Sequence, residues 1–282
     1  MREINLVLSG SGVRFPYFVG ALKAIEEVGL RVRRLVGTSG GALVGTAYKT
    51  GISLRNIERL AIESDYESIA SWHPGKLALL PVRGYINSGA RYRRLLGALM
   101  GDRTFASVPD FAAVVTNLSK SETVICHAGT TPELALVDGV YASGAIPIVF
   151  EPHWHEGDVW VDGTVSDDFA IDWRALRNGL LTVGINLGLE HGPLTPSSAI
   201  DVIRVSISNL ISAADRKRIE DAPPHAIISN IPLPIDPLDF AIRPAKKREL
   251  VERGYLDTLR LLSVNEVVGF GGGGHDAQPG LQ

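Results

Sequence analysis

The chain has 282 residues, a formal net charge of −3 and 45% hydrophobic residues. This size predicts one large globular domain over residues 1–268, and the charge balance gives no reason to expect a nucleic-acid partner. Cys126 is the only cysteine, which excludes an intramolecular disulfide and a cysteine-based zinc site. We expect neither a signal peptide nor a spanning helix, and therefore a cytoplasmic protein.

The chain begins with a predicted buried strand over Ile4–Leu8, the loop Ser9–Pro16, and a helix over about residues 17–28. A strand, a glycine-rich loop and a helix form a common anion-binding arrangement, because amide groups converge where side chains are absent. A dinucleotide fingerprint would need a third glycine at Phe15 and an acidic residue after the second strand, and both are missing. We therefore favour an oxyanion loop.

The second predicted strand, about residues 33–36, ends in Gly37-Thr38-Ser39-Gly40-Gly41. Gly-x-Ser-x-Gly between a strand and a helix is the pattern of a nucleophile elbow, a tight turn that holds its serine with a strained backbone. Gly37 and Gly41 let the chain segments pass one another, and Gly40 adds room. Ser39 would then lie at the N-terminus of the next helix, where negative charge is favoured. The alternative is a glycine-rich turn that contains a serine by chance.

Two helices are predicted next, over about residues 42–49 and 53–63. The irregular segment over residues 64–88 fits either a lid over an apolar site or ordinary loop packing. Its large apolar residues include Trp72, Leu77, Leu79 and Leu80. The following helix contains Arg91, Arg93 and Arg94, which predicts a solvated basic face or, alternatively, peripheral contact with a membrane surface.

The pattern then predicts a hairpin of strands at residues 111–116 and 123–127, and a helix over residues 133–143. A short strand over residues 159–161 delivers Asp162-Gly163 to a strand end, where the aspartate is either a turn former or a placed carboxylate. Parallel strands share their C-terminal edge, so a parallel arrangement would bring Asp162 to Ser39.

The remaining segments are expected to be scaffold. Strands are predicted at residues 180–187 and 226–231, and helices at residues 196–213 and 244–262. The charged cluster over residues 215–221 is expected on a solvated face. Residues 269–282 are glycine-rich and are expected to form a disordered tail.

Several blocks together resemble the patatin-like phospholipases, also called patatin-like acyl hydrolases. The loop Gly10-Ser11-Gly12-Val13-Arg14-Phe15 is similar to the family's Gly-Gly-Gly-x-Arg/Lys-Gly, and the serine elbow follows on the next strand. Ala142-Ser143-Gly144-Ala145-Ile146-Pro147 fits the family's Ala-Ser-x-Ala-x-Pro, and Asp162-Gly163-Thr164 is similar to its Asp-Gly-Gly or Asp-Gly-Ala. The blocks occur in the family's order, and the resemblance spans about residues 4–172.

The resemblance implies a three-layer α/β/α sandwich around a mostly parallel sheet, and hydrolysis of the acyl esters of phospholipids or lysophospholipids. It implies that Ser39 is the nucleophile and Asp162 its base, with no metal or other cofactor. Oxyanion and substrate contacts would come from Gly10, Ser11, Gly12, Val13, Arg14 and Gly40. Neither the head group nor the oligomeric state follows from the sequence.

This sequence departs from the family pattern at Ser11 and Phe15, where the family has glycine. Serine at position 11 is compatible with the loop if only its amide is used. The bulk of Phe15 would reshape or partly block the acyl site. These departures leave open a degenerate member that binds lipid or a partner without turnover.

The histidines suggest two further alternatives. His153 and His155 have strand spacing that puts both imidazoles on one face, which favours a surface hairpin over a metal site, because two ligands are too few. His191 and His225 follow Asp162 in chain order, as the histidine of a Ser-Asp-His α/β-hydrolase would.

Overall fold

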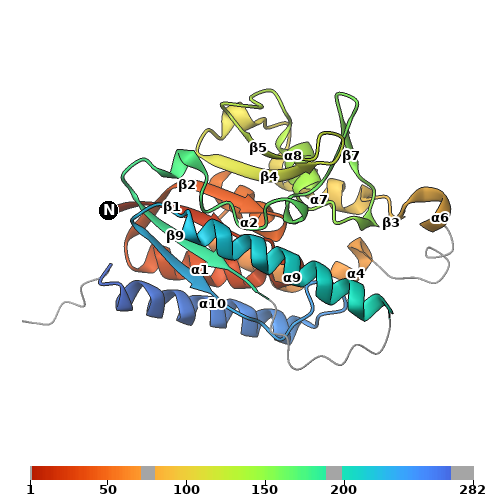
Figure 1. Cartoon of the computed structure of the whole chain (residues 1–282). Coiled ribbons are helices and arrows are strands. Elements are labelled where there is room, and N and C mark those ends of the chain that lie inside the picture. Colours follow the sequence, from red (N-terminus) through yellow and green to blue (C-terminus); the bar gives the residue numbers. More distant parts are fainter. Residues whose placement is uncertain (1, 71–79, 189–198, 268–282) are drawn as a thin grey trace, which may run out of the picture.

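The computed structural model describes residues 2–70, 80–188 and 199–267 (Figure 1). The predicted tail over residues 269–282 lies outside the described residues, as do Trp72, Leu77, Leu79 and His191. The described parts of the predicted lid segment include two short helices and a strand, which are α4 (Tyr66–Ile69), α6 (Leu80–Arg83) and β3 (Tyr85–Asn87).

The central sheet has eight strands, of which seven follow the order β10-β9-β1-β2-β4-β8-β7 while β5 pairs with β4. Five of these strands are parallel to one another: β1 (Arg2–Leu8), β2 (Leu30–Thr38), β4 (Phe111–Asn117), β9 (Leu181–Asn186) and β10 (Ala226–Asn230). Three run antiparallel to their neighbours: β5 (Glu122–His127), β7 (His153–His155) and β8 (Asp158–Asp162). A separate pair joins β3 to β6 (Ile148–Phe150).

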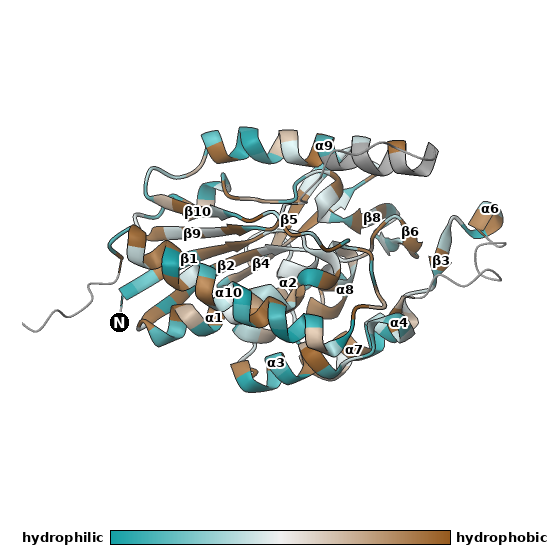
Figure 2. Cartoon of the chain, turned by 90° about the horizontal axis from the view of Figure 1, so that it is seen from below, coloured by the Kyte–Doolittle hydropathy of each residue, from teal (hydrophilic) through white to brown (hydrophobic). Residues whose placement is uncertain are grey.

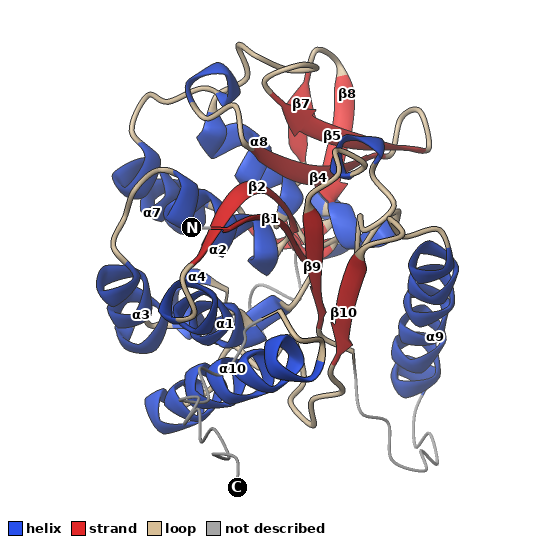
Figure 3. Cartoon of the chain, turned by 90° about the vertical axis from the view of Figure 1, so that its left-hand side faces the viewer, coloured by secondary structure: helices blue, strands red, loops and turns tan. Residues whose placement is uncertain are grey.

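Helices cover both faces of the sheet, so the fold is the expected three-layer arrangement (Figure 3). One face carries α1 (Pro16–Glu27), α2 (Gly40–Lys49), α3 (Leu54–Glu63), α7 (Ala90–Met100), α8 (Leu136–Ser143) and α10 (Pro244–Val264). The other face is covered by the segment 169–176 and α9 (Ala199–Glu220). The central strands are predominantly apolar, whereas α3, α9 and α10 carry many polar residues (Figure 2).

The direction of β8 corrects the expectation that Asp162 ends a parallel strand. β8 runs antiparallel to β4, while β2 runs parallel to β4. Thr38 lies opposite Val114 of β4, and Asp162 lies opposite Val115, the next residue along. β8 therefore approaches from the opposite direction and ends where β2 ends.

The charged cluster in α9 is not simply a solvated face, because Asp215 is buried. The Asn186 side-chain amide donates to Asp215 Oδ2 over 3.0 Å. The Arg218 Nε lies 3.1 Å from Asp167 Oδ1, in the loop that follows β8. These contacts dock α9 on the end of β9 and on that loop, so the solvated-face prediction is wrong for this side of the helix.

The basic helix α7 also differs in part from a solvated face. Arg93 Nη1 lies 2.7 Å from Asp138 Oδ1, and the guanidinium lies 3.6 Å from the centre of the Tyr141 ring. Arg91 and Arg94 are exposed. Arg93 therefore connects α7 to α8. The other two arginines, Arg91 and Arg94, face solvent as expected.

Candidate active site

Ser39 forms the turn between β2 and α2. Its backbone has a φ of 51° and a ψ of −118°, a region that non-glycine residues rarely adopt and that stores local strain. A Cβ atom on Gly37 would lie 2.5 Å from the carbonyl carbon of Gly41, and one on Gly41 would lie 2.5 Å from the Leu8 carbonyl oxygen. Since no side chain tolerates such contacts, the predicted need for glycine on both sides of Ser39 is confirmed.

The hydroxyl of Ser39 donates a hydrogen bond to Oδ2 of Asp162, with 2.7 Å between the two oxygen atoms. Oδ1 of Asp162 accepts a bond of 2.9 Å from the Thr164 amide. The side chains of Ser39 and Asp162 are both buried. Burial raises the pKa of Asp162 to about 6, against the opposing effect of the bonds from Ser39 and Thr164. A carboxylate that is mostly ionised at neutral pH is thus in direct contact with the serine hydroxyl.

Ser143 holds the backbone of the elbow. Its hydroxyl is fully buried and accepts a bond of 2.9 Å from the Ser39 amide. The pattern Ala-Ser-x-Ala-x-Pro marks this position but does not indicate its partner, so no role for Ser143 follows from the sequence. The structure adds Ser143 to the site as a positioning residue.

Two amides of the glycine-rich loop are already hydrogen-bonded within the protein. The Gly10 N–H donates to the Asp168 carbonyl oxygen over 3.1 Å. The Val13 N–H donates to the Pro237 carbonyl oxygen over 2.9 Å. Neither amide can bind an oxyanion without giving up one of these bonds.

Arg14 fastens the loop to the end of β9. Its amide donates to the Ser11 carbonyl oxygen over 3.1 Å, and its Nε reaches the same oxygen over 3.0 Å. Its two terminal nitrogens donate to the carbonyl oxygens of Gly188 and Leu187 over 2.8 and 2.9 Å. Burial lowers the pKa of Arg14 to about 10, against the opposing charges of nearby carboxylates. Arg14 therefore holds three backbone carbonyls in place and does not line the pocket beside Ser39.

The amides of Ser11, Gly12 and Gly40 have no hydrogen-bond acceptor among the described residues. Gly12 has a φ of 54°, and a Cβ there would lie 2.0 Å from the Pro237 carbonyl oxygen. A Cβ on Gly40 would lie 2.2 Å from Ser11 Oγ, so serine fits at position 11 because residue 40 is glycine. Gly12 and Gly40 line the same pocket as Ser39.

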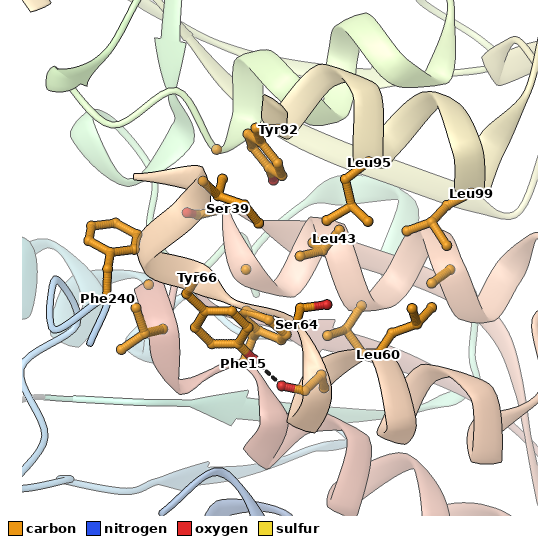
Figure 4. A pocket seen from close by; sticks show the side chains of 18 of the residues that line it. Phe15, Ser39, Leu43, Leu60, Ser64, Tyr66, Tyr92, Leu95, Leu99 and Phe240 are labelled. Atoms are coloured by element: carbon orange, nitrogen blue, oxygen red, sulfur yellow. Dashed lines mark hydrogen bonds between the residues drawn. The ribbon is translucent and has the colours of Figure 1, made fainter. Parts of the chain in front are cut away.

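An apolar pocket opens beside Ser39, with a volume of about 910 Å³ when its open mouth is included (Figure 4). Phe15, whose bulk was expected to reshape or block the acyl site, lines this pocket. Its ring packs on that of Tyr66, with 5.0 Å between the ring centres. Phe15 thus forms part of the pocket wall and leaves Ser39 open to the pocket.

No histidine among the described residues is hydrogen-bonded to Ser39 or to the Asp162 carboxylate. His225 is exposed and directly precedes β10, and its carbonyl oxygen accepts a bond of 3.3 Å from Thr182 at the start of β9. This is the amino end of the parallel strands, whereas Ser39 follows the carboxyl end of β2. A triad through His225 is therefore contradicted.

His153 and His155 share one face of β7 as predicted, with 6.2 Å between their ring centres. Nδ1 of His153 lies 2.8 Å from an Arg93 nitrogen. Among the described residues, no three His, Cys, Asp or Glu side chains are grouped as a metal site requires. In that same part of the chain, no helix has the length and hydropathy needed to cross a bilayer.

Two curated proteins are similar to part of this chain. A probable lipid hydrolase of Invertebrate iridescent virus 6 is 24% identical over 179 residues, which are 60% of this chain and 62% of the viral protein. The lysophospholipase nte1 of Aspergillus fumigatus is 27% identical over 172 residues, which are 61% of this chain and 11% of the fungal protein. The chain thus spans less than two thirds of the length of either relative.

A solved structure, VipD from Legionella pneumophila, superimposes with a TM-score of 0.55 at 18% sequence identity. The superposition covers 93% of this chain and 67% of that one, and it supports the fold. The family model of the patatin-like phospholipases matches residues 6–172, which is more than half of the chain and includes the loop, the elbow and Asp162. By this match, the chain belongs to the patatin-like phospholipase family.

Proposed function

We propose that this chain is a serine acyl hydrolase that cleaves acyl esters of phospholipids or lysophospholipids, with Ser39 as nucleophile and Asp162 as base. The observation that carries the proposal is the 2.7 Å hydrogen bond from the Ser39 hydroxyl to the Asp162 carboxylate, beside an apolar pocket. A serine hydroxyl is a weak nucleophile until a base takes its proton, and Asp162 is positioned for that task.

In the proposed reaction, Ser39 Oγ attacks the ester carbonyl carbon while its proton passes to Asp162. The carbonyl oxygen becomes an oxyanion, which the amides of Gly12 and Gly40 stabilise together with the N-terminus of α2. When the tetrahedral intermediate collapses, the bond to the alcohol oxygen breaks and Asp162 returns the proton to that oxygen. Water then attacks the acyl-serine ester by the same route, which releases the fatty acid and restores both side chains.

The lipid assignment is supported by the pocket and by the relatives. The pocket lining is almost entirely apolar, which favours a hydrocarbon ligand over a polar one. The viral relative is named a probable lipid hydrolase and the fungal relative a lysophospholipase. Exposed basic and apolar side chains, such as Arg91 and Val82, are compatible with peripheral contact of the protein with a membrane.

The test combines covalent labelling with hydrolysis. A fluorophosphonate probe should label the wild-type protein at Ser39, because labelling requires an activated serine, and the protein should hydrolyse lysophosphatidylcholine or phosphatidylcholine. Ser39→Ala should lose both properties while keeping its fold, whereas Ser263→Ala, which removes a hydroxyl on α10, should keep both. A folded wild-type protein that is neither labelled nor active would instead be a non-catalytic lipid-binding member of the family.

A further inference from the structure

Three helices each contribute one face to the lining of the apolar pocket beside Ser39. The lining runs from Gly40 to Ala47 on α2, from Ile57 on α3 to Ser64 directly after this helix, and from Tyr92 to Leu99 on α7. The lining positions are i, i+3 and i+7 on each helix, with i+4 added on α2 and α3. This is the spacing of a single helix face, so three straight stripes enclose an elongated channel.

The channel starts at Ser39 and extends along α2. Gly40 directly follows Ser39, and Ala47 lies two helical turns further on. Leu95 and Leu99 lie successively farther from Ser39 in Figure 4, over Leu43 of α2. Ala47 and Leu99 therefore mark the far end of the channel.

The near part of the channel has a fixed aromatic wall. Phe15 packs on Tyr66, and the Lys247 ammonium lies over the Tyr66 ring, 3.5 Å from its centre. Lys247 also donates to the Ser64 carbonyl oxygen over 2.7 Å, which ties the end of α3 to α10. Held in this way, Phe15 and Tyr66 narrow the channel next to the nucleophile.

We infer that this channel binds the acyl chain of the ester lengthwise, and that Ala47 and Leu99 set the chain length that the protein prefers. The inference rests on the proposed function, since it places the ester carbonyl at Ser39. An apolar channel that begins at the nucleophile suits the hydrocarbon attached to the carbonyl carbon, because burying a polar head group there would cost its hydration. The head group then remains on the open side of Ser39.

The distance along α2 from Ser39 to Ala47 indicates which carbon atom of a bound acyl chain would reach Ala47. Ala47 lies eight positions after Ser39, and at about 1.5 Å per helical residue this separation is about 12 Å. An extended hydrocarbon, whose bonds of about 1.5 Å advance the chain by somewhat less than that, covers this distance with about ten carbon atoms. Chains shorter than this would not reach Ala47, whereas longer ones would pass it.

The test compares Ala47→Phe, which fills the far part of the channel, with Ala98→Phe, which adds the same ring to an exposed position on α7. The substrates are p-nitrophenyl butanoate, octanoate and hexadecanoate in one detergent. In Ala47→Phe, kcat/KM for hexadecanoate relative to butanoate should fall at least about tenfold, because several methylene groups lose their burial. In Ala98→Phe this ratio should equal that of the wild type.

Leu99→Phe provides a second variant if Ala47→Phe does not fold, since Leu99 is only partly buried, and its ratio should fall in the same direction. A wild-type ratio in either folded variant would overturn the inference. If the wild type hydrolyses none of the esters, the proposed function has failed, and binding of dansyl-aminoundecanoic acid tests the channel without turnover. Ala47→Phe should then weaken that binding about tenfold and Ala98→Phe should not, while equal binding by all three proteins rejects the channel as a chain-binding site.

Discussion

The Ser39 hydroxyl and the Asp162 carboxylate meet although the strands that carry them, β2 and β8, run in opposite directions. β5 pairs with β4 along nearly the whole of one edge, so β2 and β8 share the other edge. β2 occupies that edge up to Val114, and β8 continues it from Val115. The two strands therefore abut end to end on β4, which places the Asp162 carboxylate directly against the serine of the elbow.

Asp162→Asn should abolish hydrolysis and at the same time stabilise the fold at neutral pH. Burial raises the pKa of the folded carboxyl to about 6, above an unfolded value of about 3.9, so the ionised side chain costs stability at neutral pH. The shift corresponds to about 3 kcal/mol at most, and asparagine removes this cost while it can still accept from Thr164 and contact Ser39.

Urea unfolding of the wild type and Asp162→Asn over a range of pH measures this effect. The stability advantage of the variant should grow as the pH rises from about 4 to about 6 and stay constant above that range. Over this range the Asp162 carboxyl of the wild type ionises more readily in the unfolded than in the folded state, which lowers the free energy of unfolding. A variant that is inactive but less stable than the wild type at neutral pH would show that the ionised Asp162 carboxylate stabilises the fold.

The pH dependence of hydrolysis should follow the same group. Asp162 can take the Ser39 proton only when it is ionised, so kcat/KM should rise with pH and level off above an inflection near pH 6. The rate of fluorophosphonate labelling should show the same inflection, with circular dichroism confirming the fold across the range. A profile that is flat between pH 5 and pH 8 would speak against Asp162 as the base.

Much of the site could be predicted because its local geometry depends on glycine. Gly37 and Gly41 are required by the closeness of the backbone on both sides of Ser39, and this need is visible in the sequence. The direction of β8 could not be predicted, since an apolar run has the same pattern in either direction. A short strand ending in Asp162 is therefore compatible with a parallel and an antiparallel partner.

Contacts between distant parts of the chain explain the remaining differences. The basic position Arg14 is visible in the loop, but its partners at Leu187 and Gly188 are far away in sequence. Likewise, a stripe of apolar residues predicts a buried helix face without indicating whether that face packs against the core or lines a channel. For this reason the pocket along α2, α3 and α7 could not be predicted from the sequence and is visible only in the structure.

Ser143→Ala should reduce both activity and stability. The variant leaves the buried Ser39 amide without its acceptor, which costs about 1–3 kcal/mol of stability and frees the strained elbow to move. We expect kcat to fall about tenfold with KM nearly unchanged, because the nucleophile is displaced while the pocket stays intact. Ser263→Ala, which removes a hydroxyl bond on α10, should leave kcat unchanged, and a wild-type kcat in Ser143→Ala would contradict the positioning role.

His225→Ala should keep most of the activity. The side chain is exposed at the amino end of the parallel strands, on the opposite edge of the sheet from Ser39. We make the same prediction for His191→Ala, although His191 lies outside the described residues. If either folded variant is as inactive as Ser39→Ala, a histidine takes part in the reaction and the assignment of Asp162 as the sole base is wrong.

Arg14→Gln should weaken both the fold and the reaction, because Arg14 donates to three backbone carbonyls and so joins the glycine-rich loop to the end of β9. Losing charged hydrogen bonds of this kind costs about 2–4 kcal/mol in urea unfolding. The loop amides then lose their fixed position beside Ser39, so kcat should fall at least about tenfold. Arg14→Lys keeps a charge but lacks the planar fork, and should lie between the wild type and Arg14→Gln.

Arg31→Gln is the matched control for Arg14→Gln, because Arg31 makes an exposed ion pair of 3.5 Å with Glu3 on the neighbouring strand. A surface pair of this kind contributes less than about 1 kcal/mol, so both stability and kcat should stay close to the wild type. A folded Arg14→Gln protein with the kcat of Arg31→Gln would show that the loop keeps its position without the arginine. The donors beside Ser39 would then be held by the backbone hydrogen bonds that the amides of Gly10, Val13 and residue 14 donate.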